Sequence, residues 1–229
     1  MKSDHSSSPL TRDRILAAAL ELIDRHGVHG FSVRDLARTL GVYPTALYWH
    51  VPSRNALIAG AVAHALGELR PPDVEADWRD ELRSLFRRYR DAVRRHPHIA
   101  QVIGAQLVSN ESLSPVLVDR LLALLENAGF RGARLLNAYN VVIAAMVGFV
   151  TLELSPLPED DPVQWAKAHE ARLRDVSADD CPTLSRHLPK FADRAFVVRW
   201  SSGTERPLDA SFEAWVEVVV EGLAVLKDA

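Results

Sequence analysis

Residues 32–54 read SVRDLARTLGVYPTALYWHVPSR, and the pattern within them decides the fold of this chain. Ala37, Gly41 and Leu47 have the spacing of two short helices joined by a tight turn. The small side chain of Ala37 lets the second helix approach the first, and Gly41 permits the left-handed backbone of the turn. Leu47 returns the second helix to the core. The stretch therefore predicts a helix-turn-helix, which commonly places its second helix in the major groove of DNA.

The second helix of this pair also carries hydrogen-bond donors. Leu47 points inward in the run LYWH, while Tyr48, His50 and the nearby Arg54 can present their donors outward. Such a set suits the phosphates of a DNA backbone. It favours a DNA-binding role over the alternative, a helical hairpin that does not bind DNA.

The segment resembles the DNA-binding head of the tetracycline-repressor (TetR) family, and the string LYWHV matches the tetracycline repressors themselves. The resemblance continues more weakly along the chain, as helix order and as the closing pattern FEAWVEVVVEGL. It implies an all-α fold with two domains. Residues 1–60 would form a three-helix helix-turn-helix head, and residues 61–229 a larger helical effector-binding and dimerisation domain.

Charge and composition are consistent with local rather than general contact with DNA. The chain of 229 residues has a formal net charge of −3, which argues against a wholly basic coat protein. Residues 1–60 hold seven Lys or Arg against five Asp or Glu, so the small positive excess lies in the head. A single cysteine, Cys181, and a polar start without a secretory signal predict a bacterial-type cytoplasmic location.

Helix signals continue outward from this pattern in both directions. Thr11 is an N-cap candidate for a first helix that Gly27 stops, and Ser32 is one for the second helix. Pro44 suits the first turn of the third helix. Later signals predict helices from Ser53 to about 69 and over about 78–95, 97–109, 115–128, 131–154, 163–174 and 208–227. The one short strand candidate is 196–198.

The apolar run of residues 135–154 is long enough to span a membrane. Asn137, Asn140 and Glu153 would make that placement costly in lipid. We therefore predict no membrane partner, and a helix buried within protein on most sides.

The family resemblance implies a division of labour among the head residues. Arg34, at the start of the second helix, would read a base, because its planar fork can pair with guanine O6 and N7. Thr45 could bond a base edge and Ala46 could touch a thymine methyl. Trp49 either packs against the first helix or lies along the sugar-phosphate wall. The predicted DNA contacts are Arg34, Tyr43, Pro44, Thr45, Ala46, Tyr48, Trp49, His50 and Arg54.

Two of these positions depart from the tetracycline repressors. Pro44 stands where those proteins carry a base-reading Gln, and Ala46 stands where they have Thr. The operator should therefore differ in sequence.

One head makes too few contacts for a specific site, so we expect a two-fold homodimer on a near-palindromic double-stranded operator. The helices over 131–154 and 208–227 would form a four-helix bundle with their mates. Alternatively, their apolar surface packs wholly inside one subunit. The remaining helices would enclose a small-molecule effector pocket lined by Leu85, Tyr89, Ile103, Gln106, Leu107, Val118, Leu121, Met146 and Phe149.

We expect no cofactor and no metal in this pocket. Tetracycline repressors hold their drug through a magnesium ion bound to a histidine, and Ile103 stands at the matching point. His96 and His98 flank a proline and suit a surface better than a metal site. Motifs of hydrolases, phosphate-binding loops and zinc proteases are missing from the sequence, so we do not expect an enzyme.

Three hypotheses remain open at this point. The chain is a repressor that a mostly apolar effector releases from its operator, an effector-free DNA-binding regulator, or a helical binding or catalytic protein with a vestigial head. The hydrogen-bond donors of the head, on Arg34, Tyr48, His50 and Arg54, favour the two hypotheses in which the chain is a DNA-binding regulator.

Overall fold

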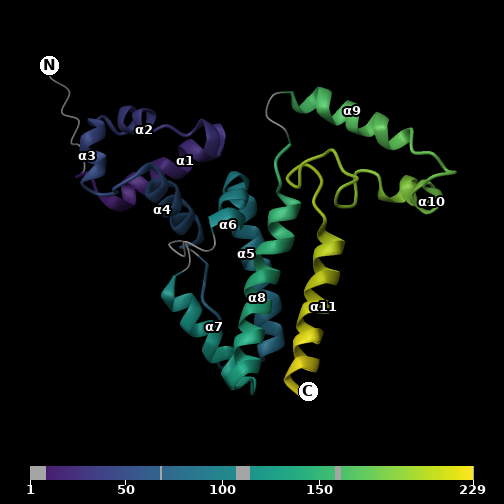
Figure 1. Ribbon diagram of the computed structural model, residues 1–229. Helices are drawn as coiled ribbons and strands as arrows, with labels where there is room; N and C mark the ends of the chain where they lie inside the picture. Colours follow the sequence, from purple (N-terminus) through teal and green to yellow (C-terminus); the bar gives the residue numbers. More distant parts are fainter. Residues whose placement is uncertain (1–8, 68, 107–113, 158–160, 229) are drawn as a thin grey trace.

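A computed structural model describes residues 9–67, 69–106, 114–157 and 161–228, and in this part of the chain the regular elements are all helices (Figure 1). The head contains α1 (Arg12–Gly30), α2 (Val33–Leu40) and α3 (Pro44–Tyr48). The fourth helix, α4 (Arg54–Leu66), packs against α1 and leads into the rest of the molecule. The predicted all-α class and the order of the head helices are confirmed.

The head folds for local reasons that the sequence contains. Thr11 Oγ1 accepts a hydrogen bond from the Arg14 amide, and Ser32 Oγ accepts one from the Arg34 amide. Gly41 ends α2 with φ +68°, the left-handed conformation that the turn requires. Gly27, predicted to stop the first helix, instead kinks it with φ +68° and ψ 169°, and α1 resumes as far as Gly30.

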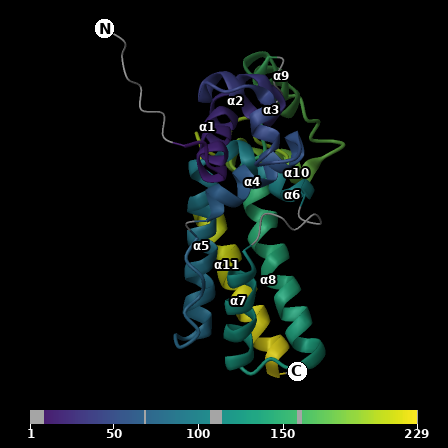
Figure 2. The same cartoon turned by 90° about the vertical axis from the view of Figure 1, so that its left-hand side faces the viewer.

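The second part of the molecule is a bundle of long helices below the head (Figure 2). It contains α5 (Trp78–Arg95), the short 3-10 helix η1 (Pro97–Ile99), α6 (Ala100–Gln106), α7 (Pro115–Asn127), α8 (Gly132–Glu153) and α11 (Asp209–Asp228). The helix α8 contacts α5, α6, α7 and α11 and is therefore the centre of the bundle.

A ladder of ion pairs fixes α5 against α11, which runs antiparallel to it. Arg83 Nη2 lies 2.8 Å from Glu217 Oε2, and Arg87 Nε lies 3.0 Å from Glu213 Oε1. These hydrogen bonds raise the pKa of both arginines and lower the pKa of both glutamates. The ladder also pairs Arg79 with Glu221 and Arg94 with Asp209.

A buried ion pair joins three helices of the bundle. Arg90 on α5 donates from Nε and Nη2 to Glu153 at the end of α8, at 2.8 and 2.5 Å, and the two side chains are 6% and 0% exposed. The Leu208 amide, just before α11, donates to the same carboxylate at 2.8 Å, and Phe212 lies under the guanidinium. Burial alone would lower the pKa of Arg90, but the hydrogen bonds and charges of Glu153 and Asp209 together outweigh burial and raise the pKa.

Two further helices, α9 (Pro162–Arg174) and α10 (Pro182–Phe191), project from the bundle and contain no buried residue (Figure 1). The sequence pattern missed α10, because Pro182 and Pro189 read as breaks although the first occupies the tolerated N1 position. The strand candidate was wrong. Residues 196–198 belong to an irregular loop in which Val197 has φ +71°.

The apolar helix α8 is less covered than predicted. It is long and apolar enough to cross a membrane, and only 33% of that span is buried in the single chain. Its inner face packs on the bundle through residues such as Ala138, Val142 and Met146, while Leu136 and Val141 are exposed. The expectation that protein surrounds it on most sides is therefore wrong for one subunit.

Candidate DNA interface and effector core

The start of α2 and the exposed face of α3 form one surface at the end of the head. Arg34, Pro44 and Thr45 are exposed, and Tyr43 is 83% exposed. Ala46 is half-buried, while Leu47, the inward residue of α3, is fully buried. This surface therefore presents the predicted base-contacting side chains to solvent while Leu47 anchors α3 to the core.

Tyr48, Trp49 and His50 follow at the end of α3, and all three are exposed. The Trp49 side chain is 86% exposed, so the alternative in which it packs against α1 is wrong. An aromatic ring with one donor, left in solvent at the edge of a helix-turn-helix, can lie along a sugar-phosphate backbone. The contact of Trp49 with DNA stays a prediction.

Arg54 has a different environment from its neighbours in the predicted set. Its Nη2 donates to the Val28 carbonyl at 2.7 Å and to the Phe31 carbonyl at 3.2 Å, and Nε also donates to Phe31 at 3.3 Å. Its guanidinium lies 5.7 Å from the centre of the Phe31 ring. Arg54 therefore ties the start of α4 to the end of α1. Its contact with a DNA phosphate stays a prediction.

Replacing Arg54 with Ala should therefore destabilise the head. Hydrogen bonds from a charged donor are worth about 1.5–3 kcal/mol. Because this side chain is exposed, we expect the free energy of unfolding to fall by about 1.5 kcal/mol. Urea unfolding followed by circular dichroism measures it. Unchanged stability, with DNA affinity lowered equally on all sequences, would favour the phosphate role.

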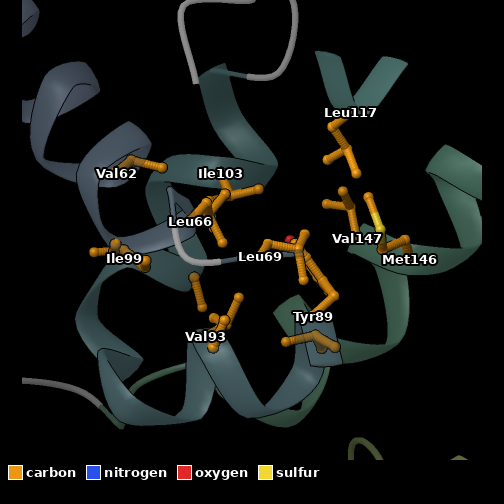
Figure 3. Close-up of a cluster of buried hydrophobic side chains, with 14 of the residues drawn as sticks. Val62, Leu66, Leu69, Tyr89, Val93, Ile99, Ile103, Leu117, Met146 and Val147 are labelled. Carbon is orange, nitrogen blue, oxygen red and sulfur yellow. The ribbon is translucent and has the colours of Figure 1, made fainter. Parts of the chain in front are cut away.

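The helix α4 belongs structurally to both parts of the molecule. Figure 3 shows Val62, Leu66 and, just beyond the helix, Leu69 in a buried cluster with α5, η1, α6, α7 and α8. Tyr89 points from α5 into this cluster, and burial raises its pKa. A change in the packing of this cluster would therefore act directly on the helix that carries the head.

The structure brings together part of the predicted pocket. Tyr89, Ile103 and Met146 lie in the cluster of Figure 3. Leu85 and Leu121 are buried in the same core, and Val118 is half-buried. Leu107 and the side chain of Gln106 lie outside the described residues.

Phe149 belongs to the same hydrophobic core and lies in an aromatic group. Its ring contacts the rings of Phe196, Phe212 and Trp215, with centroids 5.3 to 5.5 Å away. This aromatic group joins α8 to α11 and to the loop before it. Core packing accounts for the position of Phe149, and its contact with an effector stays a prediction.

The two predicted surface histidines also differ from each other. His98 is exposed, but His96 is half-buried, with Nδ1 2.7 Å from Asp24 Oδ2 on α1. This contact links the head to the start of η1. In the described residues no cluster of three or more histidine, cysteine or acidic side chains could hold a metal ion.

An apolar stripe on α8 and α11 is left without a partner in the single chain. Leu136, Val141 and Leu152 are exposed on α8. On α11 the exposed residues recur at helical spacing: Ser211, Ala214, Val218, Gly222 and Val225. The alternative in which these two helices pack wholly inside one subunit is therefore wrong.

Comparison with known proteins agrees with this geometry. Residues 15–61 match the family model of bacterial regulatory proteins of the tetR family, and residues 71–226 match the tetracyclin repressor-like C-terminal domain. The chain belongs to the TetR family. A helix-turn-helix-type transcriptional regulator of Saccharopolyspora erythraea is 30% identical over 190 residues, which are 82% of this chain and 79% of that protein.

Solved structures of similar proteins show the same TetR fold. ActR of Streptomyces coelicolor, in complex with actinorhodin, matches 95% of this chain and 96% of its own, with a TM-score of 0.70 and 23% identity. BioQ with its double-stranded DNA operator matches 64% of this chain and 89% of its own, with a TM-score of 0.57 and 32% identity.

The protein is thus a TetR-family transcriptional regulator that binds DNA as a homodimer. Its relatives are transcriptional regulators rather than enzymes.

Proposed function

We propose that this TetR-family protein is a repressor, that a small organic molecule binds among α4 to α8, and that binding releases the operator. The observation that carries the proposal is the position of α4, which supplies Val62 and Leu66 to the buried cluster and also holds the head through Arg54. A ligand in the cluster would shift α4 and change the spacing of two heads in a dimer. An effector can do this only by binding the released state more tightly.

The head residues have distinct proposed roles. Arg34 reads a base from the start of α2, with Tyr43, Pro44, Thr45 and Ala46 along the groove. Tyr48, Trp49 and His50 contact the backbone. Their exposure on one surface supports this division. The boundary between the two domains, near residue 60, then falls within α4, which serves both.

The proposed effector is mostly apolar and of drug size, and it binds without a divalent metal or other cofactor. Tyr89, Ile103 and Met146 line the cluster with one hydroxyl and no charge. ActR binds actinorhodin, which supports a drug-sized organic effector for a protein of the same fold. On this proposal the protein is not an enzyme, and it acts in the bacterial cytoplasm, where the chromosome lies.

The two-fold interface is proposed to form from the exposed stripes of α8 and α11. A stable dimer should bury more than about 1,200 Å² in total. Because Val218 is 71% exposed at the middle of the α11 stripe, a symmetric contact would bring it close to the partner chain.

Val218→Glu should therefore dissociate the dimer, since two carboxylates would be buried near the axis without partners. Light scattering at micromolar concentration is expected to show a monomer, and affinity for DNA should fall with it. Val116→Glu, an exposed valine on α7, is the matched control and should stay dimeric. A dimeric Val218→Glu protein would place the interface elsewhere.

Operator release tests the effector proposal. A duplex that this protein selects from a random library is labelled with a fluorophore and bound to the protein. Drug-sized polycyclic compounds are then titrated into this complex with and without EDTA. We expect release by an uncharged member of the set, unaffected by EDTA. Release that needs magnesium would overturn the metal-free site, and a core without any cavity of about 300 Å³ would favour the effector-free regulator.

A further inference from the structure

A cavity lies outside the buried cluster, at the junction of head and bundle. Its volume is about 500 Å³, within the range of small-molecule sites. The end of α1 forms one wall and the start of η1 and α6 another. Residues 154–157, Pro162 and residues 202–204 supply the rest of the described lining, and the cavity is partly open to solvent. A ligand in this cavity would touch both the head and the bundle.

The polar wall of the cavity is positive or hydrogen-bond donating. Arg25, His26 and His29 come from the end of α1, and His98 comes from η1. The described residues that line the cavity include no Asp or Glu, although the chain has 30 acidic residues. Arg25 donates from Nε to the Glu21 carbonyl at 3.2 Å, and its Nη2 lies 3.9 Å from the Glu21 carboxylate. Its side chain is 57% exposed, so the remaining guanidinium donors are open to an anion.

Apolar residues also line the cavity. Leu154 and Leu157 come from the segment after α8, and Val28 and Pro97 lie between the polar residues of α1 and η1. Leu154 is buried. The cavity therefore offers an apolar surface beside Arg25 and three imidazoles. This combination suits a molecule with a hydrocarbon or aromatic body and an acidic group.

The wall made by residues 202–204 is held in place by its own contacts. Asp193 accepts hydrogen bonds from the Ser201 hydroxyl and amide, both at 2.7 Å, and from Arg206 Nη1 at 2.6 Å. Gly203 packs so closely on α8 that an added Cβ would lie 2.2 Å from the Glu153 carbonyl oxygen. The loop thus has a fixed position against α8.

We propose that this junction cavity is a second ligand site, separate from the core cluster, and that it binds a drug-sized organic carboxylate. The carboxylate lies against Arg25 and the imidazoles, and the apolar body lies against Leu154 and Leu157. The ligand spans α1 and η1, next to the contact of His96 with Asp24. It therefore holds the head in its observed position on the bundle.

Isothermal titration calorimetry of the full chain with 2-naphthoate tests the site without DNA. We expect one molecule bound per chain, and binding roughly tenfold weaker for the neutral amide, 2-naphthamide. Arg25→Gln combined with His98→Gln should weaken naphthoate binding by at least about tenfold. Equal binding of acid and amide, or unchanged binding by the double variant, overturns the proposal.

Two further variants separate loss of the site from loss of the fold. Thr204→Trp fills the cavity from its exposed loop and should abolish binding while leaving the cationic residues in place. Arg186→Gln, an exposed arginine on α10 outside the cavity, should bind like the unchanged protein. Each variant is checked for native helix content and melting temperature. A folded Thr204→Trp protein that still binds naphthoate places the acid elsewhere.

A second measurement asks whether the site is coupled to DNA, and it rests on the proposed function. Saturating naphthoate should change the affinity for the selected duplex by roughly threefold or more, and the duplex should change naphthoate affinity by the same factor. No change, with calorimetric binding intact, would overturn the coupling. Failure to bind any duplex would instead count against the proposed function.

Discussion

Replacing Arg34 with Ala is expected to relax base preference at one position of each half-site. A bidentate contact of arginine with guanine discriminates by about 1–3 kcal/mol, and a two-fold dimer loses it twice, so the cognate duplex should lose roughly 2–6 kcal/mol. Arg34 is exposed at the first turn of α2, where its amide rather than its side chain serves the Ser32 cap. The substitution should therefore leave the head folded.

Fluorescence anisotropy on cognate and random duplexes measures this loss. Affinity for random DNA should fall only slightly with Arg34→Ala, because each head loses one positive charge near the phosphates. His50→Ala is the contrasting variant, because loss of a contact with the DNA backbone weakens binding to cognate and random duplexes alike. Arg38→Ala is the matched control, since Arg38 lies on the same helix and pairs with Asp35. Equal losses on both duplexes for Arg34→Ala and His50→Ala would contradict the assignment of base reading to Arg34.

Replacing Glu153 with Ala should strongly destabilise the bundle. The substitution leaves the Arg90 guanidinium buried with only an exposed partner, Asp209, and leaves the Leu208 amide without its acceptor. Breaking one side of a buried pair costs about 3–5 kcal/mol. For a chain of this size the melting temperature should fall by roughly 6–20 °C. Thermal and urea unfolding at one fixed protein concentration measure the change.

Two controls separate burial from charge. Glu213→Ala breaks the half-exposed pair with Arg87 and should cost at most about 1 kcal/mol. Changing both Arg90 and Glu153 to Leu should cost less than Glu153→Ala alone, because no unpaired charge is then buried. Similar losses in the free energy of unfolding for Glu153→Ala and Glu213→Ala would show that the buried pair stabilises the fold no more than the half-exposed pair.

The sequence alone determined the features that depend on neighbours along the chain. Thr11 and Ser32 cap their helices, Gly41 takes the left-handed turn, and Leu47 is buried, all as predicted. Each depends on contacts within a few residues, so a local pattern is sufficient to predict it. The same is true of the helices that have a buried face, because apolar periodicity marks that face. The pattern missed α10, which has no buried residue.

Tertiary structure alone decided the roles that depend on distant partners. Arg54 reads as a phosphate ligand in the sequence, yet it donates to carbonyls 23 and 26 residues away. Arg90 and Glu153, 63 residues apart, carry no sign of their pairing. The sequence does not show which rings surround Phe149, and the fold brings Phe196, Phe212 and Trp215 to it. A side chain's role depends on what the fold brings within hydrogen-bond or van der Waals distance, and sequence spacing does not contain that information.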